Sequence, residues 1–157
     1  MAENENEALK KFEDGVKVLE SKLNKETTIW NSRIKKIAHD MRGNIKTIPD
    51  LEADIISFKQ DVVDEIRAYS LVLHKNNITL KELRKQRFEF YSTTYQIAIK
   101  NDATKKGLIE ADIAKIQYKN DLLDAHTDFL RETANDLESF KYSVKNRLEL
   151  LKILGLD

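Results

Sequence analysis

The residues between Leu83 and Tyr95 have the types and spacing needed to hold a strand of nucleic acid. Arg84, Lys85 and Arg87 place three positive charges within four positions, and aromatic residues follow them directly. Single-stranded nucleic acid is held by a positive surface that follows the phosphates and by aromatic rings that stack on the bases. The segment therefore predicts such a site. Nearby lysines that extend the positive surface are Lys81, Lys100, Lys105 and Lys106.

The aromatic residues of this segment also fit a second interpretation. Phe88, Tyr91 and Tyr95 are spaced at i, i+3 and i+7, which is the spacing of a buried helix face. The basic residues would then be the solvated side of that helix. The spacing favours the core for these rings but does not exclude stacking. Tyr91 therefore stays a candidate for contact with DNA, together with the basic side chains Lys81, Arg84, Lys85 and Arg87.

Positive charge is concentrated around this segment, although the formal net charge of the 157 residues is zero. Residues 75–106 contain eight basic and three acidic side chains, a net charge of +5. The zero net charge of the whole chain therefore does not reveal this candidate anion-binding segment. The acidic flanks and the mixed charge of every predicted helix argue against a helix that lies on a membrane surface.

The sequence contains no pattern typical of a catalytic site. It has no Gly-rich phosphate loop and no G-x-S-x-G or H-E-x-x-H motif. None of His39, His74 and His126 follows a glutamate by three positions, as a di-iron helical bundle requires. We expect these histidines at the surface or at its boundary. Cysteine is absent, which excludes disulfides and thiolate metal sites. We therefore expect a binding protein without a cofactor or metal, and not an enzyme.

The elements that must position the basic segment are predicted to be long amphipathic helices. Charged residues make up 34% of the chain, and only four glycines and one proline interrupt it. A first helix is predicted over residues 7–42, ending at Gly43. A second begins with a capping box at Thr47 and Asp50 and continues to about residue 95. Asn76 and Asn77 either break this helix, with a capping box at Thr79 and Glu82 beyond them, or lie within it.

The last helix gives the clearest periodicity. A turn is predicted over residues 101–107 with Asp102 as N-cap, and Gly155 is predicted as the C-terminal stop. Apolar residues then recur every seven positions, at Ile109, Ile116, Leu123, Leu130, Leu137, Val144 and Leu151. A second row is interrupted by the polar residues Asn120 and Thr127. A helix this long must lie against another long helix. We therefore predict an all-α fold of helical hairpins or coiled coil that assembles into a homo-oligomer.

The basic segment resembles that of the UvsY-type recombination mediator proteins of T-even-like bacteriophages. That family has the form Lys-x-Arg-aromatic/Leu-acidic-aromatic-Tyr-Ser/Thr-Gly, and residues 85–93 here read Lys-Gln-Arg-Phe-Glu-Phe-Tyr-Ser-Thr. Stretches at 48–51, 113–118, 128–132, 142–146 and 152–155 are similar in order and spacing. The chain departs from the family at Thr93, which replaces its glycine, and in residues 1–47.

This resemblance implies a non-enzymatic accessory protein. Family members form ring-like homo-oligomers, bind single-stranded DNA, and help a RecA-like recombinase displace a single-stranded DNA-binding protein. Lys85 and Arg87 match the two basic positions that the family links to DNA contact. The resemblance implies a mediator-like helical domain over residues 48–157, preceded by an N-terminal helical extension over residues 1–47. The alternative is a coiled-coil scaffold or virion assembly protein that does not bind nucleic acid.

The first six residues are acidic and polar, and no apolar stretch approaches the ~18 residues of a membrane span. We therefore expect a soluble cytoplasmic protein without a signal peptide, located in the host cytoplasm if a phage encodes it.

Overall fold

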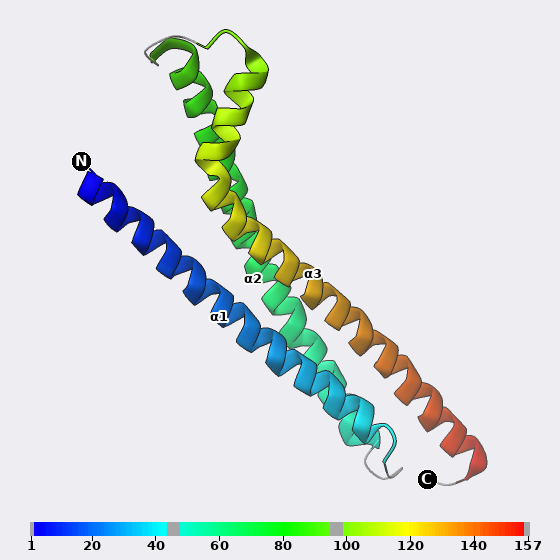
Figure 1. Cartoon of the computed structure of the whole chain (residues 1–157). Helices are drawn as coiled ribbons and strands as arrows, with labels where there is room; N and C mark the ends of the chain where they lie inside the picture. The colour runs from blue at the N-terminus through cyan, green and yellow to red at the C-terminus, as the bar shows by residue number, and fades with distance from the viewer. Residues whose placement is uncertain (1, 44–47, 95–98, 156–157) are drawn as a thin grey trace. The chain divides into compact units, whose positions relative to one another are not determined.

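Helices account for nearly all of the described chain. The computed structural model describes residues 2–43, 48–94 and 99–155, apart from the side chains of residues 2–9 and 94. Within these ranges the elements are α1 (Ala2–Asp40), α2 (Ile48–Glu89), the π-helical turn η2 (Phe90–Thr94) and α3 (Asp102–Leu154), and there is no strand (Figure 1). The predicted all-α class is confirmed for the described residues.

The ends of α1 and α3 differ from the predicted ends by a few residues. α1 ends at Asp40, and the amide of Gly43 donates to the Asp40 carbonyl over 2.9 Å in the turn that follows. The N-cap of α3 is Asn101, whose Oδ1 accepts from the amides of Ala103 at 2.9 Å and Thr104 at 3.2 Å. The prediction of Asp102 as N-cap and of a turn reaching residue 107 is therefore wrong, because the asparagine side chain caps the helix one residue earlier.

α2 continues through Asn76 and Asn77 without a break. The hydroxyl of Thr79 donates to the carbonyl of Lys75 over 3.2 Å, a bond between successive turns of one helix. Of the two alternatives, the continuous helix is therefore confirmed, and the break with a capping box at Thr79 and Glu82 is wrong. Gly155 follows α3 with φ 63°, the left-handed conformation that commonly ends a helix, as predicted. The predicted capping box at Thr47 and the predicted role of Tyr95 concern residues outside the described ranges.

The chain divides into two compact units, and α2 and α3 contribute to both. Unit 1 comprises residues 1–67 and 126–157, and unit 2 comprises residues 68–125. The predicted boundary after residue 47 falls in the segment between α1 and α2, whereas the units divide within α2 and within α3.

Unit 1 packs three helices together (Figure 1). Trp30 of α1 donates its indole N–H to Glu65 of α2 over 2.9 Å and meets the ring of Phe58 edge to face at 6.4 Å. Lys59 of α2 forms an ion pair with Glu138 of α3. Arg33, three residues after Trp30 in α1, pairs with Asp61 over 3.4 Å, four residues before Glu65 in α2, so the two helices are antiparallel.

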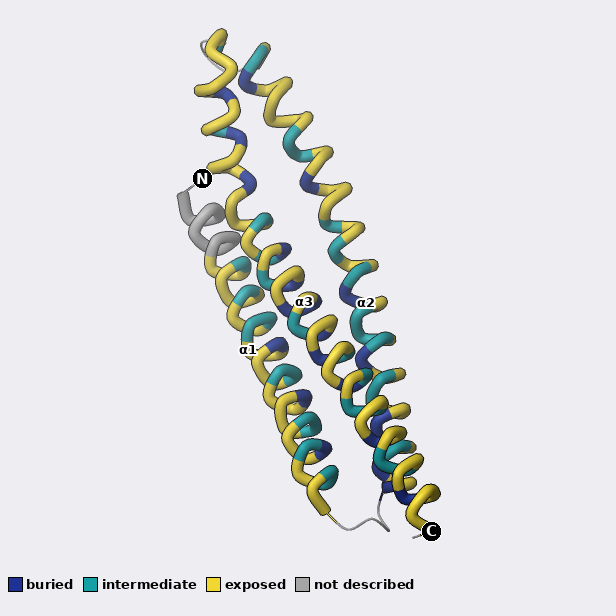
Figure 2. Tube along the Cα trace, turned by 90° about the vertical axis from the view of Figure 1, so that its right-hand side faces the viewer, coloured by how far each residue is buried: buried dark blue, intermediate teal, exposed yellow. Residues whose placement is uncertain are grey.

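The core of unit 1 is formed by the facing sides of α1, α2 and α3. Side chains with 5% or less of their surface exposed come from all three helices, and in Figure 2 the buried residues lie on the inner sides of the helices. They are Trp30, Ile37, Ile48, Leu51, Ile55, Val62, Leu130, Leu137, Val144, His126, Thr127 and Thr133. His126 was expected at the surface or at its boundary but is buried, with Nε2 3.1 Å from Glu26 Oε2 of α1. Because α3 has two neighbours in this unit, it buries polar residues outside the predicted row.

Unit 2 is an antiparallel pair made by the second part of α2 and the first part of α3. Buried Asn120 connects the two helices. Its Oδ1 accepts from Asn76 Nδ2 over 2.8 Å, and its Nδ2 donates to Asn77 Oδ1 over 2.9 Å. The residue that interrupts the second apolar row is therefore a satisfied polar contact that fixes the register of the pair.

The predicted seven-residue row of α3 is buried at six of its seven positions. Ile109, Leu123, Leu130, Leu137, Val144 and Leu151 all have 8% or less of their surface exposed. Ile116 is the exception at 36%. It lies in unit 2, in the part of α3 that pairs with the second part of α2.

Candidate nucleic-acid interface

A row of three side chains on α2 combines two ammonium groups with an exposed ring. Lys81, Lys85 and Phe88 are spaced at i, i+4 and i+7, so they lie on one face of the helix. All three are exposed, and Phe88 has 48% of its surface accessible. Across the described ranges, no carboxylate lies within ion-pair distance of Lys81 or Lys85. The row therefore offers positive charge and an aromatic ring to solvent.

Arg84, by contrast, is held against α3. Its Nε lies 3.2 Å from Glu110 Oε1, and a terminal nitrogen donates to Gln117 Oε1 over 3.3 Å. The side chain is 41% exposed, so solvent still reaches the pair. Arg84 lies on the edge of the interface between the two helices, where it partly neutralises Glu110.

Arg87 and Tyr91 meet at one carboxylate of α3. Asp112 Oδ2 lies 3.4 Å from Arg87 Nε and accepts a hydrogen bond from the Tyr91 hydroxyl over 2.9 Å. Tyr91 has only 7% of its surface exposed, whereas the Arg87 side chain is 47% exposed. Tyr91 is thus part of the core of unit 2, as the spacing favoured, and its ring is not on the exposed surface.

The π-helical turn η2 shapes the end of α2. The Tyr91 carbonyl accepts from the amide of Ile99 over 3.1 Å, which ties the start of the turn to the segment leading into α3. Phe90 meets the Tyr91 ring edge to face at 5.2 Å, and the Arg87 guanidinium lies 6.0 Å from the Phe90 centroid. Phe90 therefore packs with Arg87 and Tyr91, on a different side of α2 from Phe88.

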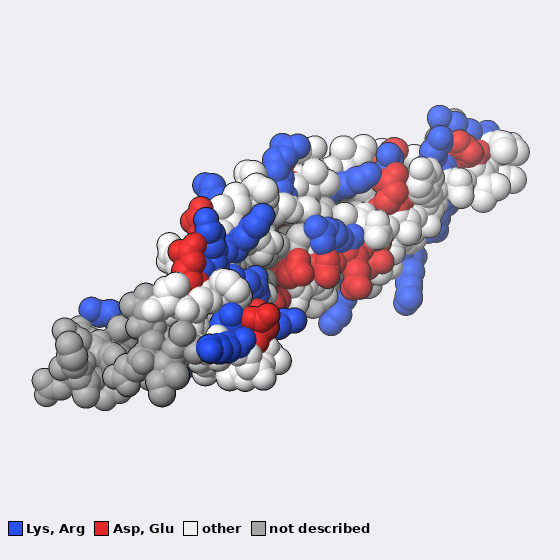
Figure 3. Space-filling view, turned by 90° about the horizontal axis from the view of Figure 1, so that it is seen from above, with Lys and Arg blue, Asp and Glu red and all other residues white. Residues whose placement is uncertain are grey.

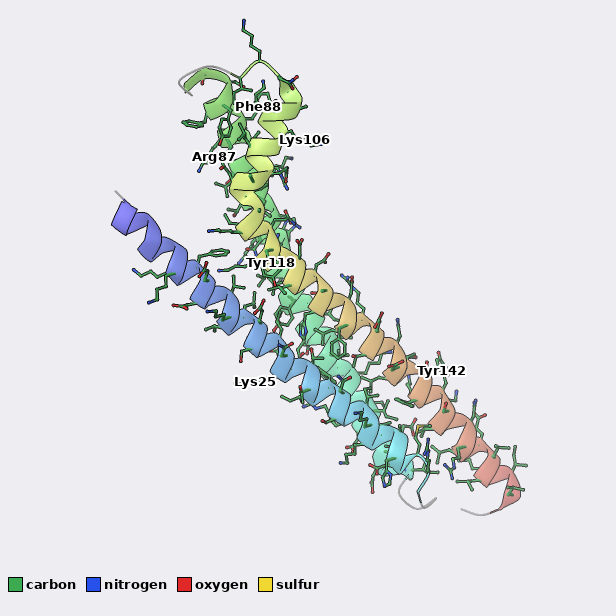
Figure 4. All side chains as sticks on the ribbon, viewed as in Figure 1. Lys25, Arg87, Phe88, Lys106, Tyr118 and Tyr142 are labelled. Atoms are coloured by element: carbon green, nitrogen blue, oxygen red, sulfur yellow. The ribbon has the colours of Figure 1, made fainter. Side chains whose placement is uncertain are left out.

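Lys105 of α3 completes the surroundings of Phe88. Its ammonium lies 4.6 Å from the centroid of the Phe88 ring and 2.8 Å from Asp102 Oδ1, and its side chain is only 10% exposed. In Figure 4, Phe88, Arg87 and Lys106 all lie at the end of unit 2 where α2 and α3 are connected. A surface hollow of about 400 Å³ is lined here by Arg84, Phe88, Asp102, Lys106, Ile109 and Glu110.

The electrostatics of this end of unit 2 are positive but mixed. Residues 75–106 carry a net charge of +5, and the acidic partners Glu110 and Asp112 reduce it to +3 over residues 75–112. On the face drawn in Figure 3, basic and acidic side chains are interspersed. Like Lys81 and Lys85, Lys106 has no carboxylate partner within the described part of the chain. The positive charges that are not neutralised here therefore belong to lysines.

Only part of the predicted set of site residues forms one surface. Lys81 and Lys85 share an exposed face, Arg84 and Arg87 pair with α3, and Tyr91 is buried. The spacing favoured the core for Phe88 without excluding an exposed ring, and the ring is exposed, with 48% of its surface accessible. Phe88 is about 60° round the helix from Tyr91, at the edge of the buried stripe. Two spacings in the sequence could have identified this surface. Phe88 follows Arg84 by four residues, and it continues the row of Lys81 and Lys85.

No group of three or more histidines, aspartates and glutamates is arranged to hold a metal ion within the described ranges. Likewise, none of the helices described is both long enough and apolar enough to cross a membrane.

Comparisons with known protein families, with curated proteins and with solved structures found nothing that matches this chain.

Proposed function

We propose that the chain is a non-catalytic recombination mediator that binds single-stranded DNA. In this role it helps to load a RecA-like recombinase onto strands coated by a single-stranded DNA-binding protein. The observation that carries the DNA-binding part is the exposed row of Lys81, Lys85 and Phe88 on α2. The recombinase and the coating protein enter through the resemblance of residues 85–93 to the mediator family.

The two lysines supply the electrostatic part of binding. They are four residues apart, which is about 6 Å of helical rise, and neither has a carboxylate partner among the described residues. An ammonium without a partner can neutralise a phosphate and release its counterions without first breaking an ion pair. Lys81 and Lys85 are therefore the primary phosphate contacts of the proposal.

Arg84 and Arg87 act as secondary contacts. Their side chains are 41% and 47% exposed, and their ion pairs with Glu110 and Asp112 span 3.2 and 3.4 Å. Ion pairs this exposed contribute about 0–1 kcal/mol. A phosphate can therefore replace the carboxylate at small cost, and Arg87 keeps the role that the resemblance gives it.

In this proposal the chain assembles into a homo-oligomer, which is ring-like as the resemblance implies. Several weak sites on one assembly can then bind a single strand tightly. One copy offers few phosphate contacts, whereas several copies offer them to the same strand. Binding at the second copy is then intramolecular, and effective concentration raises the overall affinity without any new kind of contact. A strand bound at several copies can be held extended for a recombinase.

The ion pairs of Arg84 and Arg87 favour a second candidate function. They connect α2 to α3 and neutralise two of the basic residues, as expected for a helical scaffold or virion assembly protein without affinity for nucleic acid. The two functions differ in one property, which is salt-sensitive affinity for a single strand.

A double substitution tests the proposed site. Lys81→Ala with Lys85→Ala removes the two primary phosphate contacts, so the slope of log K against log salt should flatten by about 1.4 on single-stranded DNA. Lys35→Ala with Lys36→Ala is the matched control, because it removes two exposed positive charges from α1. Fluorescence anisotropy gives the affinity, and circular dichroism checks that helicity is kept. Equal affinities for both double variants would remove the assignment of the site.

A further inference from the structure

We propose that Phe88 is a stacking platform for an unpaired base, and that it makes this surface prefer single strands to duplex. This inference rests on the proposed function and adds to it the group that recognises a base. The nearly half-exposed ring of Phe88 lies in line with Lys81 and Lys85, and a fixed ammonium lies over the ring.

Phe88 is exposed although the core of unit 2 is close by. Tyr91, three residues later, has 7% of its surface accessible, against 48% for Phe88. A phenylalanine that serves only the fold is stabilised by burial, at about 25 cal/mol per Å² of apolar surface. Leaving 48% of this side chain accessible to water forgoes part of that gain, and a base stacked on the ring would recover some of it.

The ring is also held in place before any ligand binds. Lys105 lies 4.6 Å from the ring centroid, and its ammonium is fixed by Asp102 at 2.8 Å. A cation over an aromatic ring at this distance is attracted to it. Because the Lys105 side chain is only 10% exposed, it is a constrained support rather than a mobile surface lysine. Lys105 covers one face of the ring, so a base stacks on the other face, where it meets a ring whose orientation is already restricted.

The hollow beside the ring accepts a base better than a phosphate. Its volume of about 400 Å³ falls in the range of small-ligand pockets, about 300–1,000 Å³. Asp102 and Glu110 line it together with Arg84 and Lys106, so its charge is balanced. A phosphate gains little there, whereas Lys81 and Lys85 outside the hollow attract the backbone. In a duplex the bases are already stacked and paired, so only a single strand can present one to the ring.

An oligonucleotide without bases separates stacking from charge. Binding of labelled oligo-dT, of an abasic oligonucleotide of the same length and of a duplex is compared at one salt concentration. Stacking on an aromatic side chain contributes enough for the wild-type protein to bind oligo-dT at least about fivefold more tightly than the abasic strand. Phe88→Ala should bring this ratio of affinities close to one and leave the salt slope unchanged. Phe88→Tyr keeps an aromatic ring, so its ratio should stay close to that of the wild type.

Phe90→Ala is the matched aromatic control. Phe90 packs against Tyr91 and Arg87 on another side of α2, so its removal should leave the ratio of oligo-dT to abasic affinity unchanged. A fall in the ratio as large as that of Phe88→Ala would contradict the assignment to Phe88.

A spectroscopic test does not depend on removing the ring. Trp30, the one tryptophan of the sequence, has 1% of its surface exposed and lies in unit 1. Phe88→Trp therefore adds an exposed indole whose fluorescence oligo-dT should quench, whereas the abasic strand and the wild-type protein should give no such signal.

The outcomes separate this inference from the proposed function. Salt-sensitive binding that is equally tight for oligo-dT and the abasic strand, with no quenching of Trp at position 88, would overturn the stacking role and leave DNA binding in place. Absence of binding to either strand at low salt would overturn both.

Discussion

The Nε of Arg87 lies 3.4 Å from Asp112 Oδ2, the same carboxylate oxygen that accepts the hydrogen bond of Tyr91. One acidic side chain of α3 thus holds a core tyrosine and also partly neutralises an exposed arginine of the candidate interface. DNA binding at Arg87 must compete with Asp112, and this competition can be measured.

Asp112→Asn should strengthen binding of single-stranded DNA several-fold. The amide oxygen can still accept from Tyr91, but the charge that competes with phosphate for Arg87 is gone. Fluorescence anisotropy at fixed salt measures the change. In the Arg87→Ala background the same substitution should give a smaller gain, because no arginine is left to release. An equal gain in both backgrounds would show that only the overall charge matters.

Asn120→Ala should destabilise the protein by about 1 kcal/mol. The substitution removes both hydrogen bonds to Asn76 and Asn77, whose partly exposed amides can turn to water and limit the loss. Chemical denaturation measures the free energy of unfolding. Asn135→Ala, at an exposed position of the same helix, is the control and should change it by less than about 0.5 kcal/mol.

Leu137→Ala should cost about 2–5 kcal/mol, because Leu137 is fully buried in the core of unit 1 and truncation leaves a cavity. Leu150→Ala removes the same atoms from a side chain that is 59% exposed, so it should have a small effect. Thermal or chemical unfolding of the two variants compares them. Similar losses would contradict the packing of α3 described for unit 1.

The ion pair of Glu138 predicts how stability changes in acid. The hydrogen bond from Lys59 holds the pKa of Glu138 below its ordinary value of 4.5, and the positive charges of Lys141 and Lys59 act in the same direction. A lowered pKa stabilises the fold above the unfolded-state value, and this contribution is lost as the pH falls through the folded-state value. The wild type should therefore exceed Glu138→Gln in stability at pH 6–7.

Below about pH 4.5, the stability difference between the wild type and Glu138→Gln should shrink. Unfolding by denaturant across this pH range measures it. A difference that stays constant down to the acid end of the range would show that the carboxylate charge of Glu138 does not matter.

Periodicity in the sequence was sufficient to predict the helices and most of their buried faces. The row from Ile109 to Leu151 is an example, because a buried stripe needs only a consistent spacing of apolar residues. The continuity of α2 at Asn76 and Asn77 could not be decided in the same way. In the structure the side chains of both residues bond to Asn120 of α3, a contact that is set by the register of the two helices.

The candidate interface was predictable in composition but not in detail. The sequence identified the cluster of Lys85, Arg87 and aromatic residues, but not which of them would face α3. Arg84 and Arg87 pair with carboxylates more than twenty residues away along the chain, and Phe88 differs from Tyr91 by a small rotation about α2. Contacts between α2 and α3 decide which arginines form ion pairs and which aromatic ring is buried. The spacing of residues within α2 alone does not determine these contacts.

The most direct test of the account is the salt dependence of binding to a labelled oligo-dT, followed by fluorescence anisotropy. If the end of unit 2 neutralises phosphates, log K should fall linearly with log salt, by about 0.7 for each phosphate contacted, and a duplex of the same length should bind more weakly. Absence of measurable binding at low salt, or an affinity independent of salt, would contradict the account and favour a helical scaffold without affinity for nucleic acid.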